Sequence, residues 1–560
     1  MRRLSTVQGE SAPPVRSRDT SRPVLLIGFQ SQGNLGLGYL SAVLKQHGYS
    51  VIVVDIELDP DEIVRVALGT NPVLVGFSLI FQFYVDRYAE LVRQLRGSGV
   101  SCHFTMGGHF PSLSYQQTLE LIPELDSVVR FEGEVTLVEL VDAVSVRDDW
   151  RRVDGIAYRG VDDVVTTPAR PLVENLDRLP YPDRDFEPGL VLGRRIMPIL
   201  ASRGCARTCS FCSIHKFYRA APGKIVRTRK PAEVVREMRT LHEDLDIRIF
   251  LFQDDDFPLF GPVWRRWAGE LVDELHRAEL PGKVIWKMNC RADAVDRELF
   301  IRMRNAGLYL VYMGLESGSE QGLQTLHKQT SVAQNLRAVS LLKSVGLMWE
   351  YGFMLLDPSS TFESVRENLS FLRTILADGC SPVTFCRMLP YDGTPIKNEL
   401  VQAGRLRGDV CNPDYDFLDP RLSEFYEALT ARVSLDGWIH GLEAVTQHLG
   451  CAWHEVAVME RLFPKLPGLA RYKGILRRTT QRSNELLLKV VEDLSYAYSD
   501  GRTFDWDPSD IESRRKQVLS DVLDARNAFV LRRQSLLLDA LGIEADEPLD
   551  APRVPIEQTA

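Results

Sequence analysis

Short apolar runs alternate with amphipathic stretches along most of this chain, and this alternation constrains the fold more than any other feature. The first series, from Val24 to about Val144, contains the apolar runs VLLIGF, VIVVDI, VLVGFS and HFTMGG, separated by stretches with helical periodicity. Strands that alternate with helices require crossovers, so this series predicts an α/β domain with a parallel, doubly wound (Rossmann-like) sheet. Ligands of such sheets bind beyond the carboxyl ends of the strands, which places a candidate site in the loops after Phe29, Asp55, Ser78 and Gly107.

Three of the nine cysteines crowd into eight positions. Cys205, Cys209 and Cys212 form a C-x3-C-x2-C segment directly after the apolar run IMPILA. Three thiolates at this spacing can hold three irons of a four-iron cluster and leave the fourth iron open to a ligand. A zinc site that includes His215 is the alternative, but Arg203-Gly204 before the segment and Phe211 within it favour the cluster. The odd, scattered cysteines indicate a reducing compartment and a metal site, not a disulfide framework.

The charge distribution excludes several classes of partner. Lys and Arg number 67 against 76 Asp and Glu, the net charge is -9, and no basic block occurs. Nucleic acid and anionic membranes are therefore not expected partners. Residues 1–22 contain arginines but no apolar core, so we expect a disordered leader. No run approaches the roughly 18 apolar residues of a membrane span, and a cytoplasmic protein is expected.

Glycines and a short acidic motif mark the carboxyl ends of the first series of strands. Gly36 and Gly38 open a helix, and Gly107 and Gly108 end a strand; by themselves such glycines are most simply turn residues. The motif FEGE, residues 131–134, ends the next strand. Taken together, LGLGYLSAVL, VGFS, MGGHFP and FEGEVTLVEL resemble the cobalamin-binding domain that precedes many radical S-adenosylmethionine (SAM) cores.

This resemblance implies that residues 23–150 bind cobalamin. Some cobalamin proteins have D-x-H-x-x-G after the first strand, where the histidine ligates cobalt; residues 28–33 here read GFQSQG, so no protein histidine ligand is expected. The segment from Ser78 to Gln82 should form an apolar floor beneath the corrin. The expected corrin contacts are Leu37, Ser78, Leu79, Gly107, Gly108, His109, Glu132 and Gly133.

Residues 191–400 contain six further strand–helix units, from IMPILA through IRIFLFQ, VIWKMN, LYLVYMG and WEYGFMLL to VTFCRML. With the cysteine segment they resemble the partial (β/α)6, TIM-type barrel of the radical SAM core, which implies a [4Fe-4S] cluster on Cys205, Cys209 and Cys212. Site residues of barrels gather at the carboxyl ends of the strands. The expected contacts of SAM are Asp255 or its rival Asp254 (ammonium), Arg291 (carboxylate), Glu316 and Ser317 (nucleoside or methionine moiety) and Phe211 (adenine).

Other segments complete the expected organisation. Residues 151–190 read as a hairpin and a linker, residues 401–545 as a helical domain, and residues 546–560 as a disordered tail. In the barrel, Asp357 is either a substrate contact or a turn residue. Ser360 and Glu363 are expected to form a capping box at a helix start. No protein side chain is assigned as a catalytic residue.

The resemblance implies an enzyme in which a 5′-deoxyadenosyl radical removes hydrogen from an unactivated carbon and methylcobalamin donates a methyl group to it. Its substrate would be a small molecule, such as a natural-product intermediate, a carrier-bound molecule or a peptide, and its electron donor a flavodoxin or ferredoxin. A rearrangement or cyclisation without methyl transfer is the main alternative. Methylthiolation fits less well because the first domain contains only Cys102, and a cobalamin-binding sensor would not need the three clustered cysteines.

Overall fold

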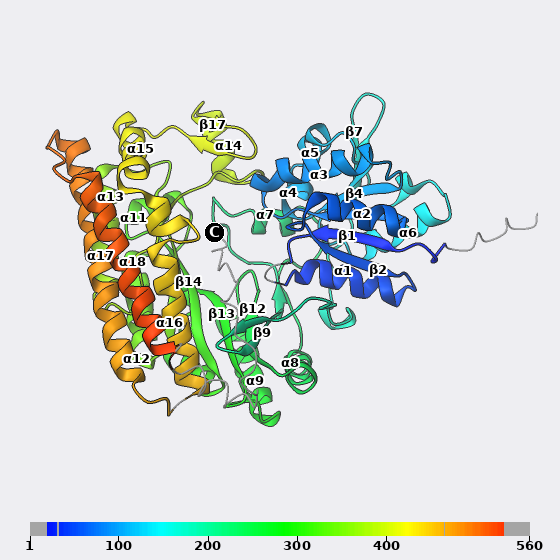
Figure 1. The fold of residues 1–560 in the computed structure, drawn as a ribbon. Coiled ribbons are helices and arrows are strands. Elements are labelled where there is room, and N and C mark those ends of the chain that lie inside the picture. The colour runs from blue at the N-terminus through cyan, green and yellow to red at the C-terminus, as the bar shows by residue number, and fades with distance from the viewer. Residues whose placement is uncertain (1–18, 31–32, 464, 531, 533–560) are drawn as a thin grey trace, which may run out of the picture.

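The computed structural model describes residues 19–30, 33–463, 465–530 and 532. The predicted tail and most of the predicted leader lie outside these residues. Figure 1 shows a first sheet with its helices, a second, curled sheet beside it, and long C-terminal helices on the far side of the second sheet. None of the helices formed by the described residues combines the length and apolar character that crossing a membrane requires.

The first sheet has the strand order β2-β1-β3-β4-β5-β6-β7, and its first five strands are parallel. These strands are β1 (Val24–Gly28), β2 (Val51–Asp55), β3 (Leu74–Ser78), β4 (His103–Gly107) and β5 (Ser127–Val129). The helices are α1 (Leu35–Gln46), α2 (Pro60–Thr70), α3 (Val85–Gly97), α4 (His109–Leu113), α5 (Tyr115–Leu121) and α6 (Glu134–Ser145). Two separate apolar clusters cover the two faces of the sheet, which confirms the doubly wound prediction.

The predicted hairpin consists of β6 (Ile156–Arg159) and β7 (Val164–Thr166), and β6 pairs antiparallel with β5. The hairpin therefore extends the first sheet. The linker after it packs on α1: the Ser41 hydroxyl donates to Asp183 at 2.6 Å, and a Cβ at Gly38 would lie 2.5 Å from the Asp183 carbonyl oxygen. Because Gly38 has no side chain, the linker can lie directly against α1. The domain limits themselves stay predictions.

The second sheet has the order β16-β15-β14-β13-β12-β9-β8, with only β8 antiparallel to its neighbour. The strands are β8 (Gly189–Val191), β9 (Arg194–Ile199), β12 (Ile247–Phe252), β13 (Ile285–Arg291), β14 (Leu308–Glu316), β15 (Met348–Leu356) and β16 (Cys386–Arg387). The outer helices are α8 (Pro231–Leu245), α9 (Gly261–Arg277), α10 (Arg297–Asn305), α11 (Glu320–Thr325), α12 (Val332–Val345) and α13 (Phe362–Leu376). The six parallel strands confirm the predicted partial barrel.

One local prediction in the barrel was wrong. The capping box of α13 is formed by Thr361 and Ser364, not by Ser360 and Glu363. The Ser360 hydroxyl instead accepts a hydrogen bond from the backbone N–H of Asp357 at 2.9 Å. The helix begins one residue later because Ser360 completes the turn that precedes it.

The two faces of the barrel strands differ in polarity. On β13, Trp286, Met288 and Cys290 are buried against the outer helices, whereas Lys287 and Asn289 on the inner face are half-buried. This alternation leaves the inner face partly accessible and polar. The barrel interior is thus not filled entirely by apolar side chains.

The C-terminal region is mainly helical, as predicted, and covers one end of the barrel. It contains α14 (Pro395–Gln402), the hairpin β17 (Leu406–Gly408) and β18 (Pro413–Tyr415), α15 (Pro420–Val433), α16 (Val445–Leu462), α17 (Leu469–Asp500) and α18 (Pro508–Val530). Trp453 and Val456 of α16 pack against Ile285 and Tyr309, near the amino ends of β13 and β14. The amino end of the barrel is therefore closed by the chain's own helix.

Candidate functional site

The loop with the three cysteines leaves β10 (Ser202–Arg203) and leads into α7 (Ile214–Arg219). β10 pairs antiparallel with β11 (Arg227–Thr228), so both ends of the segment are held together. In the middle of the loop, the backbone N–H of Ser210 donates to the Leu326 carbonyl at 3.0 Å, and the Ser210 carbonyl accepts from the N–H of Ile396 at 3.1 Å. The loop is thus anchored to the barrel.

The three thiols form a sulfur donor set that suits an iron–sulfur cluster. All three are free; Cys209 is buried, and Cys205 and Cys212 are half-buried. Burial raises the pKa of Cys205 and of Cys212 to about 12, so metal binding has to displace their protons. Among the described residues, no three His, Cys, Asp or Glu side chains are arranged to hold a single metal ion, and this includes the three cysteines with or without His215.

The three aspartates after β12 have different environments. Asp254 is buried and accepts hydrogen bonds from the Ser202 hydroxyl at 2.5 Å and from the Ala201 N–H at 3.3 Å; burial raises its pKa to about 7. Asp255 is exposed and accepts from the Gly204 N–H at 2.8 Å, which places it beside the cysteine loop. Of the two predicted SAM contacts, Asp255 therefore keeps an accessible carboxylate, whereas Asp254 supports the backbone.

Asp256 is a site residue that the sequence reasoning did not select. Its carboxylate lies 3.9 Å from the sulfur of Cys205, and burial raises its pKa to about 6. The run of three aspartates is visible in the sequence, but only the backbone path after β12 decides that Asp255 and Asp256 contact the cysteine loop and Asp254 does not.

Arg291 ends β13 next to the cysteine loop. Its guanidinium donates to the sulfur of Cys209 at 3.4 Å, pairs with Asp293 at 3.1 Å and donates to the Lys328 carbonyl. Asp293 also accepts from Arg207, within the loop, at 2.7 Å. Arg291, the predicted contact of the SAM carboxylate, therefore lies at the cysteine loop, where Asp293 partly neutralises its charge.

Glu316 and Lys328 form a buried ion pair at the carboxyl end of β14. The Lys328 ammonium lies 2.8 Å from a Glu316 carboxylate oxygen. Glu316 has a left-handed φ of 64°. A Cβ at Gly314 would overlap Glu316 and lie 2.8 Å from the Lys328 nitrogen, so the glycine makes room for the pair. Lys328 has no motif around it, and sequence reasoning missed it.

The remaining predicted barrel residues have partners within the protein, and the contacts of Ser317 and Phe211 with SAM stay predictions. The Ser317 hydroxyl is buried and donates to Asn368 at 3.0 Å. Asp357 is buried, accepts from the N–H and hydroxyl of Ser359 at 2.8 and 2.7 Å, and has its pKa raised by burial. Of its two predicted roles, the turn residue is the one observed. Phe211 is half-buried and packs against the barrel core, between two of the cysteines.

The predicted corrin floor lies at the carboxyl edge of the first sheet. Within it, Leu79 is buried, while Ile80 is 40% exposed although it is large and apolar; Phe83, which follows the predicted floor, is 38% exposed. The ring of Phe81 lies 6.4 Å from that of Tyr391, which lies in the loop between β16 and α14. Exposed apolar side chains thus lie on the segment after β3, beside the loop between β16 and α14, as an apolar floor requires.

Three of the other predicted corrin contacts are also near this edge. Ser78 and Gly107 are half-buried, and the N–H of Leu79 donates to the Gly107 carbonyl at 2.9 Å. Leu37 is buried beneath them, where a Cβ at Gly28 would lie 2.9 Å from its side chain.

Gly108 is expected to be essential for the shape of this edge. Its φ is 114°, and a Cβ there would overlap the carbonyl oxygen of Leu79. Gly108→Ala should lower the affinity for hydroxocobalamin at least about tenfold, because strain and overlap move the loop. Absorbance titration measures this. Gly99→Ala is the matched control, since Gly99 has a φ of 96° but nothing within 4 Å of the added Cβ. Equal affinities of the two variants would contradict the prediction.

His109 and Glu132 lie at the joint with the barrel, and Gly133, next to Glu132, packs within the first domain. The His109 ring lies 4.5 Å from that of Phe217 on α7, and burial lowers the pKa of His109. Glu132 accepts hydrogen bonds from Arg203, Arg227 and the N–H of Val173. Gly133 precedes α6 and would place a Cβ 3.3 Å from Leu40. Their contact with a corrin stays a prediction.

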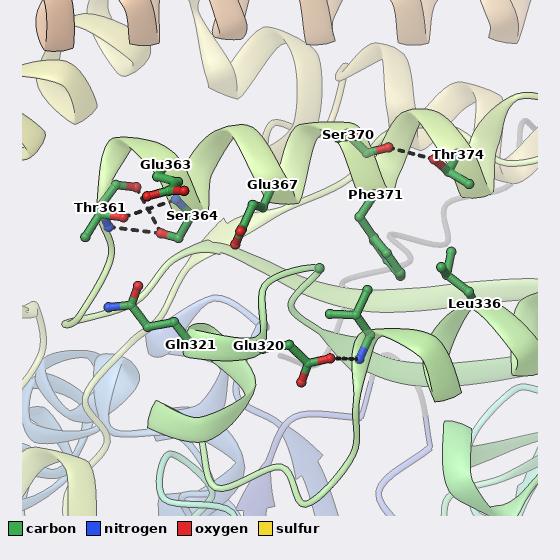
Figure 2. A pocket seen from close by; sticks show the side chains of 12 residues that line it. Glu320, Gln321, Leu336, Thr361, Glu363, Ser364, Glu367, Ser370, Phe371 and Thr374 are labelled. Carbon is green, nitrogen blue, oxygen red and sulfur yellow. Dashed lines mark hydrogen bonds between the residues drawn. The ribbon is translucent and has the colours of Figure 1, made fainter.

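A groove of about 630 Å³ opens on the outer side of the barrel, between α13 and the segment from Gly318 to Leu336. Figure 2 shows that Glu320, Glu363 and Glu367 extend along it. The Glu320 carboxylate accepts from the N–H of Val332 at 2.9 Å. None of the predicted site residues lines this groove, so it is separate from the cysteine site.

Comparison with known proteins connects both halves of the site to families. The model described as "B12 binding domain" matches residues 30–141, and the "Radical SAM superfamily" model matches residues 199–372. Each match falls inside the range predicted for that domain. The two matches confirm the predicted cofactors: cobalamin, SAM and a [4Fe-4S] cluster.

Curated relatives and solved structures agree with this organisation. The chain is 32% identical over 354 residues to an anaerobic magnesium-protoporphyrin IX monomethyl ester cyclase of Rubrivivax gelatinosus, covering 60% of this chain and 61%, less than two thirds, of that protein. It is 28% identical over 371 residues to an uncharacterized methyltransferase of Pyrococcus horikoshii, covering 64% and 76%. The structure of the cobalamin-dependent SAM radical enzyme OxsB matches with a TM-score of 0.66 and 18% identity over 93% of this chain and 84% of that one, which shows the shared fold.

Proposed function

We propose that this chain, which belongs to the cobalamin-dependent radical SAM enzymes, methylates an unactivated carbon of a small-molecule or natural-product intermediate. The observation that carries the proposal is the contact between the two cofactor edges. Phe81 of the corrin floor meets Tyr391 of the barrel, and His109 meets Phe217 just after the cysteine loop. A carbon held between these edges would be near both cofactors, and proximity is what such a transfer requires.

When bound, the cluster with SAM supplies a carbon-based radical and cobalamin supplies a methyl group. The protein's own side chains position these groups. Cys205, Cys209 and Cys212 hold the cluster, and Arg291 fixes the sulfur of Cys209 through a 3.4 Å contact. Asp255, accessible and beside the loop, is placed to accept hydrogen bonds from the ammonium of SAM.

The inner face of the barrel provides the surface for the substrate in this proposal. Lys287 and Glu350 form an ion pair at 3.4 Å there, with side chains 22% and 26% exposed, and Asn289 and Tyr312 are half-buried beside them. These groups favour a substrate with polar substituents, free, carrier-bound or peptidic. We also propose that a flavodoxin or ferredoxin supplies electrons and that the protein works in the cytoplasm.

The test uses the anaerobically reconstituted protein with cluster, cobalamin and SAM carrying a trideuterated methyl group. Candidate substrates are offered, and products are analysed by mass spectrometry. Methyl transfer predicts a product that carries the trideuterated methyl group together with 5′-deoxyadenosine. An unlabelled product formed with 5′-deoxyadenosine would contradict methylation.

A ring-forming rearrangement is the second candidate. It is favoured by the relative from Rubrivivax gelatinosus, a cyclase that is 32% identical, whereas the Pyrococcus horikoshii methyltransferase is 28% identical but is covered over more of its length. The same labelling experiment separates the two reactions. A cyclisation puts no labelled methyl group on the product, because cleavage of SAM to 5′-deoxyadenosine leaves that methyl group on the released methionine.

A further inference from the structure

Four buried charges join the first sheet to the segment that carries the cysteines. Glu132 and Glu134 follow β5, whereas Arg203 and Arg227 lie directly opposite each other on β10 and β11. Arg203 is 2.6 Å from Glu134 and 3.2 Å from Glu132, and Arg227 is 2.8 Å from both carboxylate oxygens of Glu132. The two carboxylates and two guanidinium groups form a neutral, connected set, here named the joint network.

The joint network is almost fully removed from water. The side chains of Arg203, Glu132 and Glu134 are 10%, 7% and 6% exposed, and that of Arg227 is 1% exposed. Burial by itself would raise the pKa of Glu132, but Arg203 and Arg227 outweigh it and hold the pKa below its usual value. Buried ion pairs add little stability over apolar packing, but a buried charge that loses its partner destabilises the fold strongly. Such a network therefore permits only a narrow set of relative positions of the two domains.

The backbone between the joint network and the cysteine loop is short and restricted in conformation. Arg203 is two residues before Cys205, and Gly204 between them has a φ of 88° and would place a Cβ in overlap with the Ile225 carbonyl oxygen. On the other side, Glu132 follows Phe131, whose ring lies 5.5 Å from that of Phe217. A displacement of the FEGE segment is thus transmitted through β10 to the loop that carries Cys205.

We propose that the joint network positions the corrin-binding edge of the first sheet relative to the cluster loop, with Glu132, Glu134, Arg203 and Arg227 acting as positioning residues. The inference rests on the use of both cofactors in one site, as in the proposed function. It assigns the two glutamates of the FEGE motif to interdomain geometry, and it does not depend on whether the reaction is a methylation or a cyclisation.

The test compares the unaltered holoprotein with Glu134→Gln, both loaded with cob(II)alamin and a reduced cluster. The dipolar coupling between the two paramagnetic centres is measured by electron paramagnetic resonance, which needs neither substrate nor turnover. We expect the single coupling of the unaltered protein to be lost in Glu134→Gln and replaced by a broad distribution. If the unaltered protein shows a single coupling but transfers no methyl group, only the proposed function fails, and the positioning role of the joint network stands.

Glu237→Gln is the matched control. Glu237 is 1% exposed and is held by Arg184 at 2.6 Å and by Arg229, so it is an equally buried glutamate between two arginines, outside the joint network. The Glu237→Gln variant should lower the thermal stability about as much as Glu134→Gln does, but it should leave the distribution of the dipolar coupling narrow. If Glu134→Gln does not fold, Arg203→Lys replaces it, because lysine keeps the charge but cannot bond both glutamates in a fork. A coupling as narrow in these network variants as in Glu237→Gln would overturn the proposal.

Discussion

Cys209→Ala is expected to reduce 5′-deoxyadenosine formation to below about one-thousandth of the rate of the unaltered protein, because a cluster held by two thiolates is not retained in a form that cleaves SAM. Cys209 is the buried member of the three and the one that Arg291 contacts. Iron and sulfide content after anaerobic reconstitution, and chromatography of the nucleoside product with dithionite as reductant, measure the effect.

Cys102→Ala provides the control for this prediction. Cys102 is a free, half-buried thiol of the first domain, and burial raises its pKa to about 11. Its removal should leave both iron content and 5′-deoxyadenosine formation unchanged. Full activity of Cys209→Ala would remove the basis of the enzyme assignment, whereas a loss of iron in Cys102→Ala would revive the methylthiolation alternative.

Lys328→Met is expected to destabilise the protein by about 3–5 kcal/mol, since it leaves the Glu316 carboxylate buried without its partner. The two groups are 2.8 Å apart, and their side chains are 6% and 11% exposed. The shift of the urea midpoint of the apo-protein, with an unchanged slope, measures the loss. SAM binding should weaken as well, because Glu316, the last residue of β14, is itself a predicted contact of the nucleoside or methionine moiety.

The double variant Glu316→Gln with Lys328→Met tests whether the unpaired Glu316 carboxylate causes the loss of stability. Both charges are then absent, so much of the lost stability should return, while the weakened SAM binding should persist. A double variant as unstable as Lys328→Met alone would mean that the unpaired carboxylate is not the cause.

Several particular elements could be predicted from the sequence because they depend on local patterns. The strands and helices of both sheets follow from hydrophobic periodicity, and each match of a family model falls in a predicted range. The C-x3-C-x2-C spacing and its place after a strand indicated the cluster. The start of α13 was missed by one residue, because Ser360 and Thr361 are both suitable caps and only the turn at Asp357 decides between them.

Other site residues could not be chosen from local patterns. Asp254, Asp255 and Asp256 are chemically identical neighbours, and their roles differ because one carboxylate points to Ser202, one to Gly204 and one to Cys205. The sequence did not indicate that Glu132 binds Arg227, 95 residues further along the chain; its contact with a corrin stays a prediction. No local pattern marks Lys328.

The sequence by itself determined which secondary structures form, their order, the two cofactor domains and the three cysteines. The tertiary structure decided which charged side chains meet: Arg291 at Cys209, Lys328 at Glu316, and the FEGE glutamates at Arg203 and Arg227. The physical reason is the distance along the chain over which each effect acts. Periodicity and spacing act within a few turns of chain, whereas the energy of a buried charge depends on partners that only folding brings within hydrogen-bond distance.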